Sequence, residues 1–298
     1  MKVAQFEDPQ GFCVGVELNG QWINYTDAEA AYTSVTQRVV VEPTTTILQL
    51  LEDGRFDPVE FKGVLQFLMR HRLLQQYVVS KEAVLKAPVL RPPKIIAVGL
   101  NYALHVKEGK LAIPKEPIFF AKAGSSVIGP GEVVRLPRGL GRMDHEVELA
   151  VIIGRRASQL RKKNALSVVA GYSISNDVTA RDLQSKDISS KLPWFRSKSF
   201  DTFTPLGPWI MTADEIAFPI HLKLECRVNG KIRQRANTRD MLFDVPTLIE
   251  FISRHITLEP GDVISTGTPE GIGPIKPGDT MMCRIEKIGE LVNPVRAR

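Results

Sequence analysis

The chain of 298 residues is long enough to bury a large core, and its length favours two domains over one. Its 43% of hydrophobic residues and 24% of charged residues are ordinary for a soluble globular protein. The net charge of +6 favours anionic ligands through the summed electrostatic field of the protein.

Cysteine usage, hydropathy and charge distribution exclude several classes of protein. Cys13, Cys226 and Cys283 are far apart and form no CxxC pair, which argues against a disulfide scaffold or a zinc site and fits a reducing compartment. Acidic residues lie near the N-terminus and no apolar run approaches the roughly 20 residues of a membrane span, so we expect a cytoplasmic protein without a membrane partner. The densest basic run, residues 155–163, has no aromatic residue, and we expect no nucleic-acid partner.

Residues 1–88 are expected to form a small N-terminal accessory domain with helices and strands. Asn19-Gly20 separates two alternating apolar runs, a pattern typical of a β-hairpin. Further along, Asp57-Pro58 supplies an N-cap and a proline at the first helical position. Apolar residues then recur from Phe61 at i, i+3, i+4 and i+7, the spacing of an amphipathic helix.

Residues 89–298 are expected to form a larger, mainly β domain. Residues 87–94 contain prolines and are expected to link it to the N-terminal domain. Strands are predicted at four apolar runs, residues 95–98, 117–120, 147–153 and 222–228. Helices are fewer, chiefly around residues 179–190 and 245–255. Because helices and strands do not alternate strictly, a doubly wound fold is disfavoured, and the predicted fold class is α+β.

Two glutamates one residue apart, Glu146 and Glu148, precede an uninterrupted apolar run typical of a strand that is covered on both faces. Side chains alternate along a strand, so both carboxylates face one way and Val147 faces the other. With Asp177 downstream, three carboxylates and no Cys or His cluster indicate an oxygen-lined site for Mg²⁺ or Mn²⁺. Two alternatives remain, namely a solvated edge strand and ion pairs with nearby arginines such as Arg181.

His105 and Glu108 are three residues apart, so one helical turn brings them to the same side. A carboxylate that holds a histidine in one tautomer is a recurring general base near neutral pH. Gly99 and Gly109 flank the pair and would suit a mobile lid that excludes water. Alternatively, the pair belongs to an ordinary surface helix.

Asp177, Arg181 and Gln184 have the spacing of one face of a helix that starts near Asp177. An arginine there is able to clamp a substrate carboxylate, or it forms an ordinary i,i+4 surface pair. Lys198 lies among aromatic and small residues, where its charge would neutralise a developing enolate. Thr268 lies in a turn-rich loop without the Gly-Lys-Ser/Thr ending of a P-loop, which argues against nucleotide binding.

Seven motifs in order resemble the fumarylacetoacetate hydrolase superfamily across about residues 94–295. These motifs are Val98-Gly-Leu-Asn-Tyr102, His105-x-x-Glu108, Asp144-x-Glu146-Val-Glu148-Leu-Ala, Gly171-Tyr-x-x-x-Asn176-Asp177-Val-Thr-Ala-Arg-Asp-Leu-Gln184, Lys198-Ser-Phe-Asp-Thr-Phe, Pro205-Leu-Gly-Pro208 and Thr266-Gly-Thr-Pro269. The resemblance implies a β-sandwich roll behind a variable N-terminal domain, a homodimer and a Mg²⁺ or Mn²⁺ site.

The resemblance also implies roles for individual residues. Glu146, Glu148 and Asp177 would be the metal ligands, and His105 with Glu108 would activate water. Lys198 would stabilise oxyanion or enolate charge, and the substrate would contact Arg181, Gln184 and Thr268. One departure is Leu104, where similar members commonly carry Asp.

The implied function is divalent-metal-dependent hydrolysis of a C–C bond in an acylpyruvate-like 2,4-diketo acid, such as fumarylpyruvate or acetylpyruvate, as in the catabolism of aromatic compounds. The products are pyruvate and a carboxylic acid. Because they pass through the same enolate, decarboxylation of oxaloacetate and isomerisation or decarboxylation of a 2-hydroxy-diene-dioate are alternatives. A non-catalytic metal-binding scaffold is disfavoured because it has no use for a general base.

Overall fold

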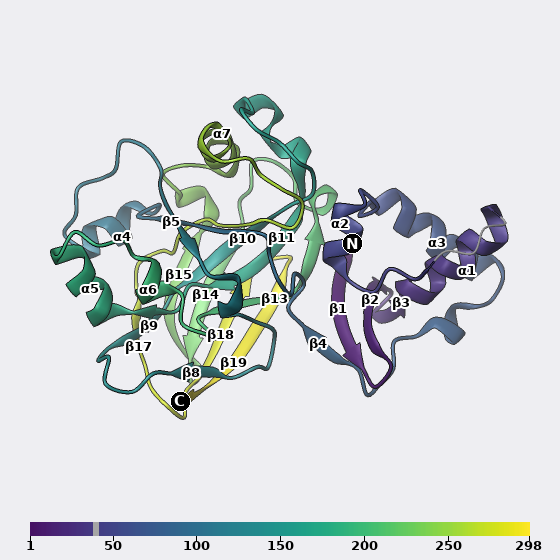
Figure 1. Ribbon diagram of the computed structural model, residues 1–298, viewed down its shortest axis with the longest axis horizontal. Coiled ribbons are helices and arrows are strands. Elements are labelled where there is room, and N and C mark those ends of the chain that lie inside the picture. The colour runs from purple at the N-terminus through teal and green to yellow at the C-terminus, as the bar shows by residue number, and fades with distance from the viewer. Residues whose placement is uncertain (38–41) are drawn as a thin grey trace.

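The computed structural model describes residues 1–37 and 42–298 (Figure 1). In these two ranges, strands dominate and form an 11-stranded, a 5-stranded and a 3-stranded sheet. The predicted α+β class with a mainly β larger part is therefore confirmed. Within the described residues, no helix combines the length and the apolar character that crossing a membrane requires.

The N-terminal segment consists of a small antiparallel set of strands with helices packed on it. Its strands are β1 (Lys2–Asp8), β2 (Gly11–Leu18), β3 (Gln21–Asn24) and β4 (Val84–Lys86). Its helices are α1 (Tyr25–Gln37), α2 (Ile47–Glu52), α3 (Pro58–Arg70) and the short 3-10 helix η1 (Leu74–Tyr77). The hairpin predicted at Asn19-Gly20 joins β2 to β3, and Asp57 caps α3 as predicted.

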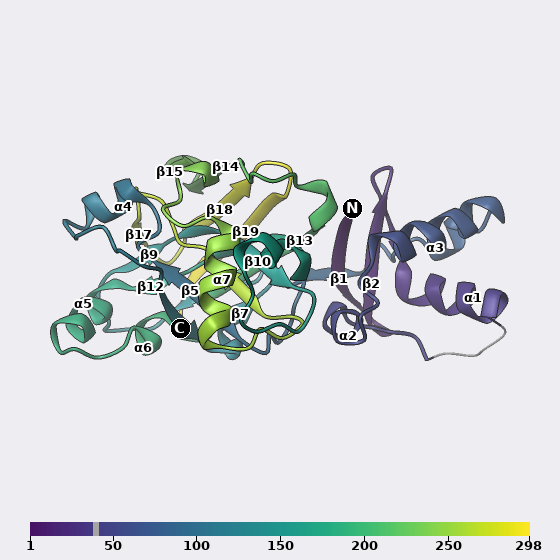
Figure 2. The ribbon, with the colours of Figure 1, turned by 90° about the horizontal axis from the view of Figure 1, so that it is seen from above.

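The N-terminal strands are continuous with the large sheet, because β1 pairs with β13 (Thr204–Thr212) through Val3 and Ile210. Residues of both segments also share one hydrophobic cluster, in which Val3 and Ile47 lie with Ile152 and Ile210. This segment projects to one end of the molecule in both views (Figures 1 and 2). The boundary at residue 88 is therefore crossed by backbone hydrogen bonds and by shared core packing.

The central part of the large sheet has the order β13-β11-β10-β16-β5-β6. Its remaining strands are β11 (Val169–Asn176), β10 (Val147–Ile153), β16 (Val263–Ser265), β5 (Ile95–Gly99) and β6 (Ile118–Lys122), and β7 (Val127–Ile128) pairs with β13. Every residue of β10 is buried, as its continuous apolar run predicted. The strand lies between β11 and β16, so it is an interior strand.

A second sheet packs against the first with the order β15-β14-β18-β19-β8. Its strands are β15 (Lys231–Asn237), β14 (Lys223–Val228), β18 (Thr280–Ile285), β19 (Gly289–Ala297) and β8 (Val134–Leu136). The core between the sheets joins Leu149 and Val151 of β10 to Cys226 and Cys283. The predicted helix at 245–255 is α7 (Val245–His255), which packs on this core (Figure 2).

Short elements complete the larger part of the molecule. A small sheet contains β12 (Thr179–Ala180), β9 (Met143–His145) and β17 (Gly273–Ile275). The helices α4 (Ala103–Glu108), α5 (Arg181–Ser189) and α6 (Phe195–Lys198) gather at the end opposite to α1 and α3 (Figures 1 and 2). The 3-10 helices are η2 (Gly124–Ser126), η3 (Lys162–Val168), η4 (Ala213–Glu215) and η5 (Thr238–Asp240).

Candidate active site

All nine predicted site residues line one cavity of about 460 Å³ at the end of the molecule where α4, α5 and α6 gather. They are His105, Glu108, Glu146, Glu148, Asp177, Arg181, Gln184, Lys198 and Thr268. Residues up to 163 positions apart in the chain thus meet in one place, because β10 begins, and β11 and β16 end, at the same edge of the sheet.

Three buried carboxylates form the centre of the site. Glu146 lies between β9 and β10, Glu148 lies in β10, and Asp177 follows β11. The backbone N–H of Asp177 donates to the Glu146 carbonyl at 2.8 Å, and the Asn176 side chain accepts from the Glu146 N–H at 2.8 Å. One oxygen from each carboxylate lies within 4.8 Å of the others. This donor set fits a hard divalent cation such as Mg²⁺ or Mn²⁺.

The carboxylates face away from the core between the sheets. Val147 and Leu149 belong to that core, whereas Glu148 faces the cavity, so the alternation predicted along the strand is confirmed. A solvated edge strand is excluded because β10 has a neighbour on each side.

Two buried lysines neutralise part of this negative charge. The Lys198 ammonium donates to Glu146 Oε2 and Asp177 Oδ2, both at 2.6 Å. Lys122 donates to Asp177 Oδ1 and, at 3.0 Å, to the Phe203 carbonyl. Burial lowers the pKa of Lys122, while at Lys198 the charges of Asp177 and Glu146 outweigh burial and keep the pKa above its usual value.

Glu146 and Glu148 have opposite electrostatic environments. Burial alone would raise the pKa of Glu146, but the charges of Lys198 and Arg181 outweigh it and hold that pKa well below its usual range. At Glu148, burial and the nearby charge of Asp177 raise the pKa to about 8. Within the described chain, Glu148 forms no ion pair, and its Oε2 accepts only from Ser265 Oγ at 2.6 Å and Gly267 N–H at 2.8 Å. Glu148 is therefore the carboxylate that a bound cation would stabilise most.

The predicted histidine–carboxylate pair forms on α4. His105 Nδ1 lies 3.3 Å from Glu108 Oε2, and Glu108 accepts from the backbone N–H of Gly271 at 3.2 Å. The side chain of His105 is 12% exposed and that of Glu108 is 39% exposed, so the pair lies at the mouth of the cavity. Gly99 makes room for Trp194, because a Cβ at this position would lie 2.6 Å from the indole.

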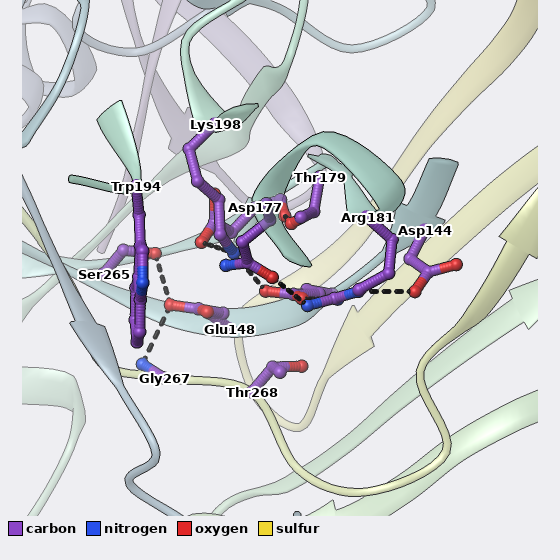
Figure 3. Close-up of polar contacts among 12 residues, drawn as sticks. Asp144, Glu148, Asp177, Thr179, Arg181, Trp194, Lys198, Ser265, Gly267 and Thr268 are labelled. Atoms are coloured by element: carbon purple, nitrogen blue, oxygen red, sulfur yellow. Dashed lines mark hydrogen bonds and ion pairs between the residues drawn. The ribbon is translucent and has the colours of Figure 1, made fainter. Parts of the chain in front are cut away.

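Arg181 and Gln184 line the cavity, but the helix that carries them begins later than predicted. α5 starts at Arg181, because residues 179–180 form β12 and pair with β9. Arg181 therefore does not pair with Asp177, and its guanidinium bonds Asp144 at 2.8 Å, Glu146 and the Gln184 oxygen at 2.5 Å. Lys198, Asp177 and Arg181 converge on the strand that carries Glu148 (Figure 3).

Thr268 lines the cavity, and its hydroxyl already forms two hydrogen bonds within the protein. The hydroxyl donates to the Val147 carbonyl at 3.0 Å and accepts from Gln234 Nε2 at 2.8 Å. Because a hydroxyl has one proton, Thr268 has only a lone pair left for a ligand in this arrangement.

Sequence reasoning missed three residues of the site, namely Lys122, Trp194 and Gln234. Lys122 ends an apolar strand, and a buried charge at that place is the only local signal it gives. Trp194 lines the cavity and packs on Phe120 with 5.3 Å between ring centroids. Gln234 is buried on β15, and nothing in its local sequence indicates its contacts.

A buried oxygen-only cation site beside a histidine–carboxylate pair is typical of enzymes that combine a divalent ion with a general base. A model of the family described as fumarylacetoacetate (FAA) hydrolase C-terminal matches residues 94–296. The chain therefore belongs to the fumarylacetoacetate hydrolase family.

Relatives with different activities resemble this chain. Oxaloacetate tautomerase FAHD2A, mitochondrial, of Homo sapiens is 42% identical over 258 residues, which are 80% of this chain and 82% of that protein. The structure of maleylpyruvate hydrolase from Sphingobium sp. SYK-6 in complex with manganese(II) ion and pyruvate is 32% identical, with a TM-score of 0.76 over 100% of this chain and 99% of that one. That of 2-hydroxyhepta-2,4-diene-1,7-dioate isomerase from Mycobacterium marinum is 31% identical, with a TM-score of 0.73 over the same shares. Members of the family are thus enzymes with hydrolase, isomerase or tautomerase activity.

Proposed function

We propose that the protein hydrolyses a C–C bond in an acylpyruvate-like 2,4-diketo acid, giving pyruvate and a carboxylic acid. The observation that carries this proposal is the His105–Glu108 pair, which lines the same cavity as the three buried carboxylates. Hydrolysis needs a group that takes a proton from water, and an imidazole held by a carboxylate is such a base near neutral pH.

The residues that would hold a divalent cation are Glu146, Glu148 and Asp177. A bound Mg²⁺ or Mn²⁺ supplies Lewis-acid chemistry and orients the carboxylate and ketone oxygens of a 2-oxo acid. The related Sphingobium hydrolase contains manganese and pyruvate together, which supports this choice of cofactor and product.

The protein residues account for the remaining steps. His105 takes a proton from water while the water oxygen bonds to the distal carbonyl carbon of the diketo acid. The bond between that carbon and the adjacent methylene carbon then breaks, and its electron pair forms the enolate of pyruvate. Lys198 is buried within the site, where its positive charge stabilises this enolate, and protonation at carbon completes pyruvate.

The role of the base is tested with Glu108→Gln, which keeps an oxygen for the Gly271 N–H but removes the charge beside His105. We expect kcat for acetylpyruvate to fall about 100-fold or more. Mn²⁺ affinity, measured by calorimetry, should stay within about twofold because Glu108 is outside the triad. If the wild-type protein with Mg²⁺ released no pyruvate from acetylpyruvate or fumarylpyruvate, the hydrolase proposal would be wrong.

A second candidate is keto–enol isomerisation of oxaloacetate, which the relationship to oxaloacetate tautomerase favours. Isomerisation moves a proton between C3 and the keto oxygen of oxaloacetate, so it needs an acid–base group but adds no water. Decarboxylation of oxaloacetate leaves an enolate without removing a proton from carbon, so it needs Lys198 and the cation more than a base. Turnover of oxaloacetate, with no pyruvate released from acetylpyruvate or fumarylpyruvate, would establish this candidate over the hydrolase. Release of CO₂ during that turnover separates decarboxylation from isomerisation.

A further inference from the structure

Among the described residues, three cationic side chains line the cavity, and two of them form ion pairs with the triad carboxylates. Every terminal nitrogen of Arg181 donates to a side-chain oxygen within the site. The Lys198 ammonium donates to two of the triad carboxylates. The third cation is Arg142, which directly precedes β9 and lines the cavity.

Arg142 has donors to spare. Its Nε donates to Asp144 Oδ1 at 2.6 Å, and its two Nη groups make no hydrogen bond to any residue for which the structure gives a position. Asp144 is fully buried and also accepts from Arg181 at 2.8 Å, so a single carboxylate faces two guanidinium groups. The charge of Arg142 is therefore only partly compensated, and its side chain is 45% exposed towards the cavity and solvent.

The backbone holds Arg142 in a fixed place. Its N–H donates to Asp182 Oδ2 at 2.9 Å, and its carbonyl accepts from the Arg181 N–H at 2.8 Å. Gly141 has φ of +74°, and a Cβ at this position would lie 2.0 Å from Asp182 Oδ2. Glycine is thus required for Asp182 to reach the Arg142 N–H. A preorganised guanidinium loses little freedom when it binds an anion.

We propose that Arg142 binds the distal carboxylate of a dicarboxylic 2,4-diketo acid, an inference that rests on the proposed hydrolase function. Arg142 is separated from the triad by Asp144 and Arg181, so it lies beyond the place of the 2-oxo acid group. The free Nη donors match a carboxylate, which guanidinium groups bind in a two-pronged geometry. The same cavity is also lined by apolar side chains suited to the carbon chain of an acyl arm. They include Leu111, Ile188 and Trp194.

The test compares two acylpyruvates that differ only at the distal end. Fumarylpyruvate carries a carboxylate there, and crotonylpyruvate carries a methyl group. In Arg142→Gln we expect KM for fumarylpyruvate to rise about 10- to 100-fold, the range for loss of a hydrogen-bonded charge, while KM for crotonylpyruvate stays within about twofold. Arg142→Lys should recover part of the loss. Arg138→Gln, an exposed arginine outside the cavity, is the matched control and should change neither value.

Loss of the Asp144 contact alone would shift both substrates equally, because both use the same triad. An equal shift, or no shift, would therefore overturn the proposal. Binding gives a second readout through calorimetry of Mn²⁺-loaded His105→Ala, with and without Arg142→Gln, using the same two compounds. A wild-type protein that turned over neither compound would refute the hydrolase function, and the binding comparison would still decide whether Arg142 selects the carboxylate.

Discussion

Lys198 lies between two carboxylates that would also be ligands of a divalent cation. Its ammonium bonds Glu146 and Asp177 at 2.6 Å, so a cation bound at the triad must share these oxygens with it. Arg181 and Lys122 add positive charge on the other sides of the same carboxylates. The site is thus close to electrically balanced before a cation binds, and a divalent ion gives it the excess positive charge that an anionic substrate requires.

We therefore expect Lys198→Met to separate cation binding from catalysis. Removal of the competing ammonium should leave Mn²⁺ affinity unchanged or higher, whereas kcat should fall about 100- to 1000-fold because no charge faces the enolate. Calorimetry and steady-state kinetics give the two values. Lys186→Met, an exposed lysine on α5, is the matched control and should alter neither. Parallel loss of affinity and rate in Lys198→Met would assign the residue a structural role.

For single residues, the sequence predicts a role in the site where the local pattern itself indicates the chemistry. Glu146 and Glu148 alternate along an apolar strand, and that alternation alone places both carboxylates on one face. Lys122 and Gln234 have no such pattern, because each acts through contacts with residues 34 to 89 positions away. Tertiary packing creates their roles, and a local pattern cannot report it.

Among the helices and strands of the site, strand pairing overrides a helical spacing that is present in the sequence. Asp177, Arg181 and Gln184 have helical spacing, yet residues 179–180 are extended because they pair with β9. The pairing turns Arg181 towards Asp144 and Glu146 and leaves Asp177 free to face the lysines. By contrast, the helix expected around residues 245–255 is confirmed as α7, where Asp244 caps the helix and its apolar face meets the core.

The two faces of β10 should respond differently to substitution. Leu149 is fully buried in the core between the sheets, so Leu149→Ala should lower the free energy of unfolding by about 2–5 kcal/mol in urea titrations. Because its side chain faces away from Glu148, the folded variant should keep Mn²⁺ affinity within about threefold. Leu192→Ala, at an exposed leucine, should change stability by less than about 0.5 kcal/mol. A large loss of Mn²⁺ affinity in folded Leu149→Ala would show that core packing sets the ligand geometry.

For the whole molecule, the large sheet connects the N-terminal strands to the candidate active site. β1 pairs with β13, β13 with β11 and β11 with β10, so an unbroken hydrogen-bonded path runs from the first strand to the ligand-bearing strand. Stabilisation at the site by a bound cation is therefore expected to appear in the unfolding of the whole chain.

Glu148→Gln tests this linkage, because the substitution should not lower stability without metal but should remove the stabilisation that a bound cation gives. Without metal, the buried Glu148 carboxylate has no ion-pair partner among the described residues, and a neutral amide keeps an oxygen for the Ser265 and Gly267 donors. The metal-free variant should therefore be at least as stable as the metal-free wild type. With free Mn²⁺ at 100 times its Kd, the wild type should gain about 2.7 kcal/mol, and the variant should gain almost nothing.

Thermal and urea unfolding with EDTA or with Mn²⁺ give both comparisons. Glu116→Gln, an exposed acid, is the matched control and should keep the full gain from metal. If Glu148→Gln destabilised the metal-free protein by several kcal/mol, the carboxylate would have to be stabilised by the fold itself. If the variant kept the full gain, the cation would bind elsewhere. Only the expected pair of results, a tolerated substitution without metal and a lost gain with it, identifies Glu148 as a ligand whose charge the protein leaves for a cation to neutralise.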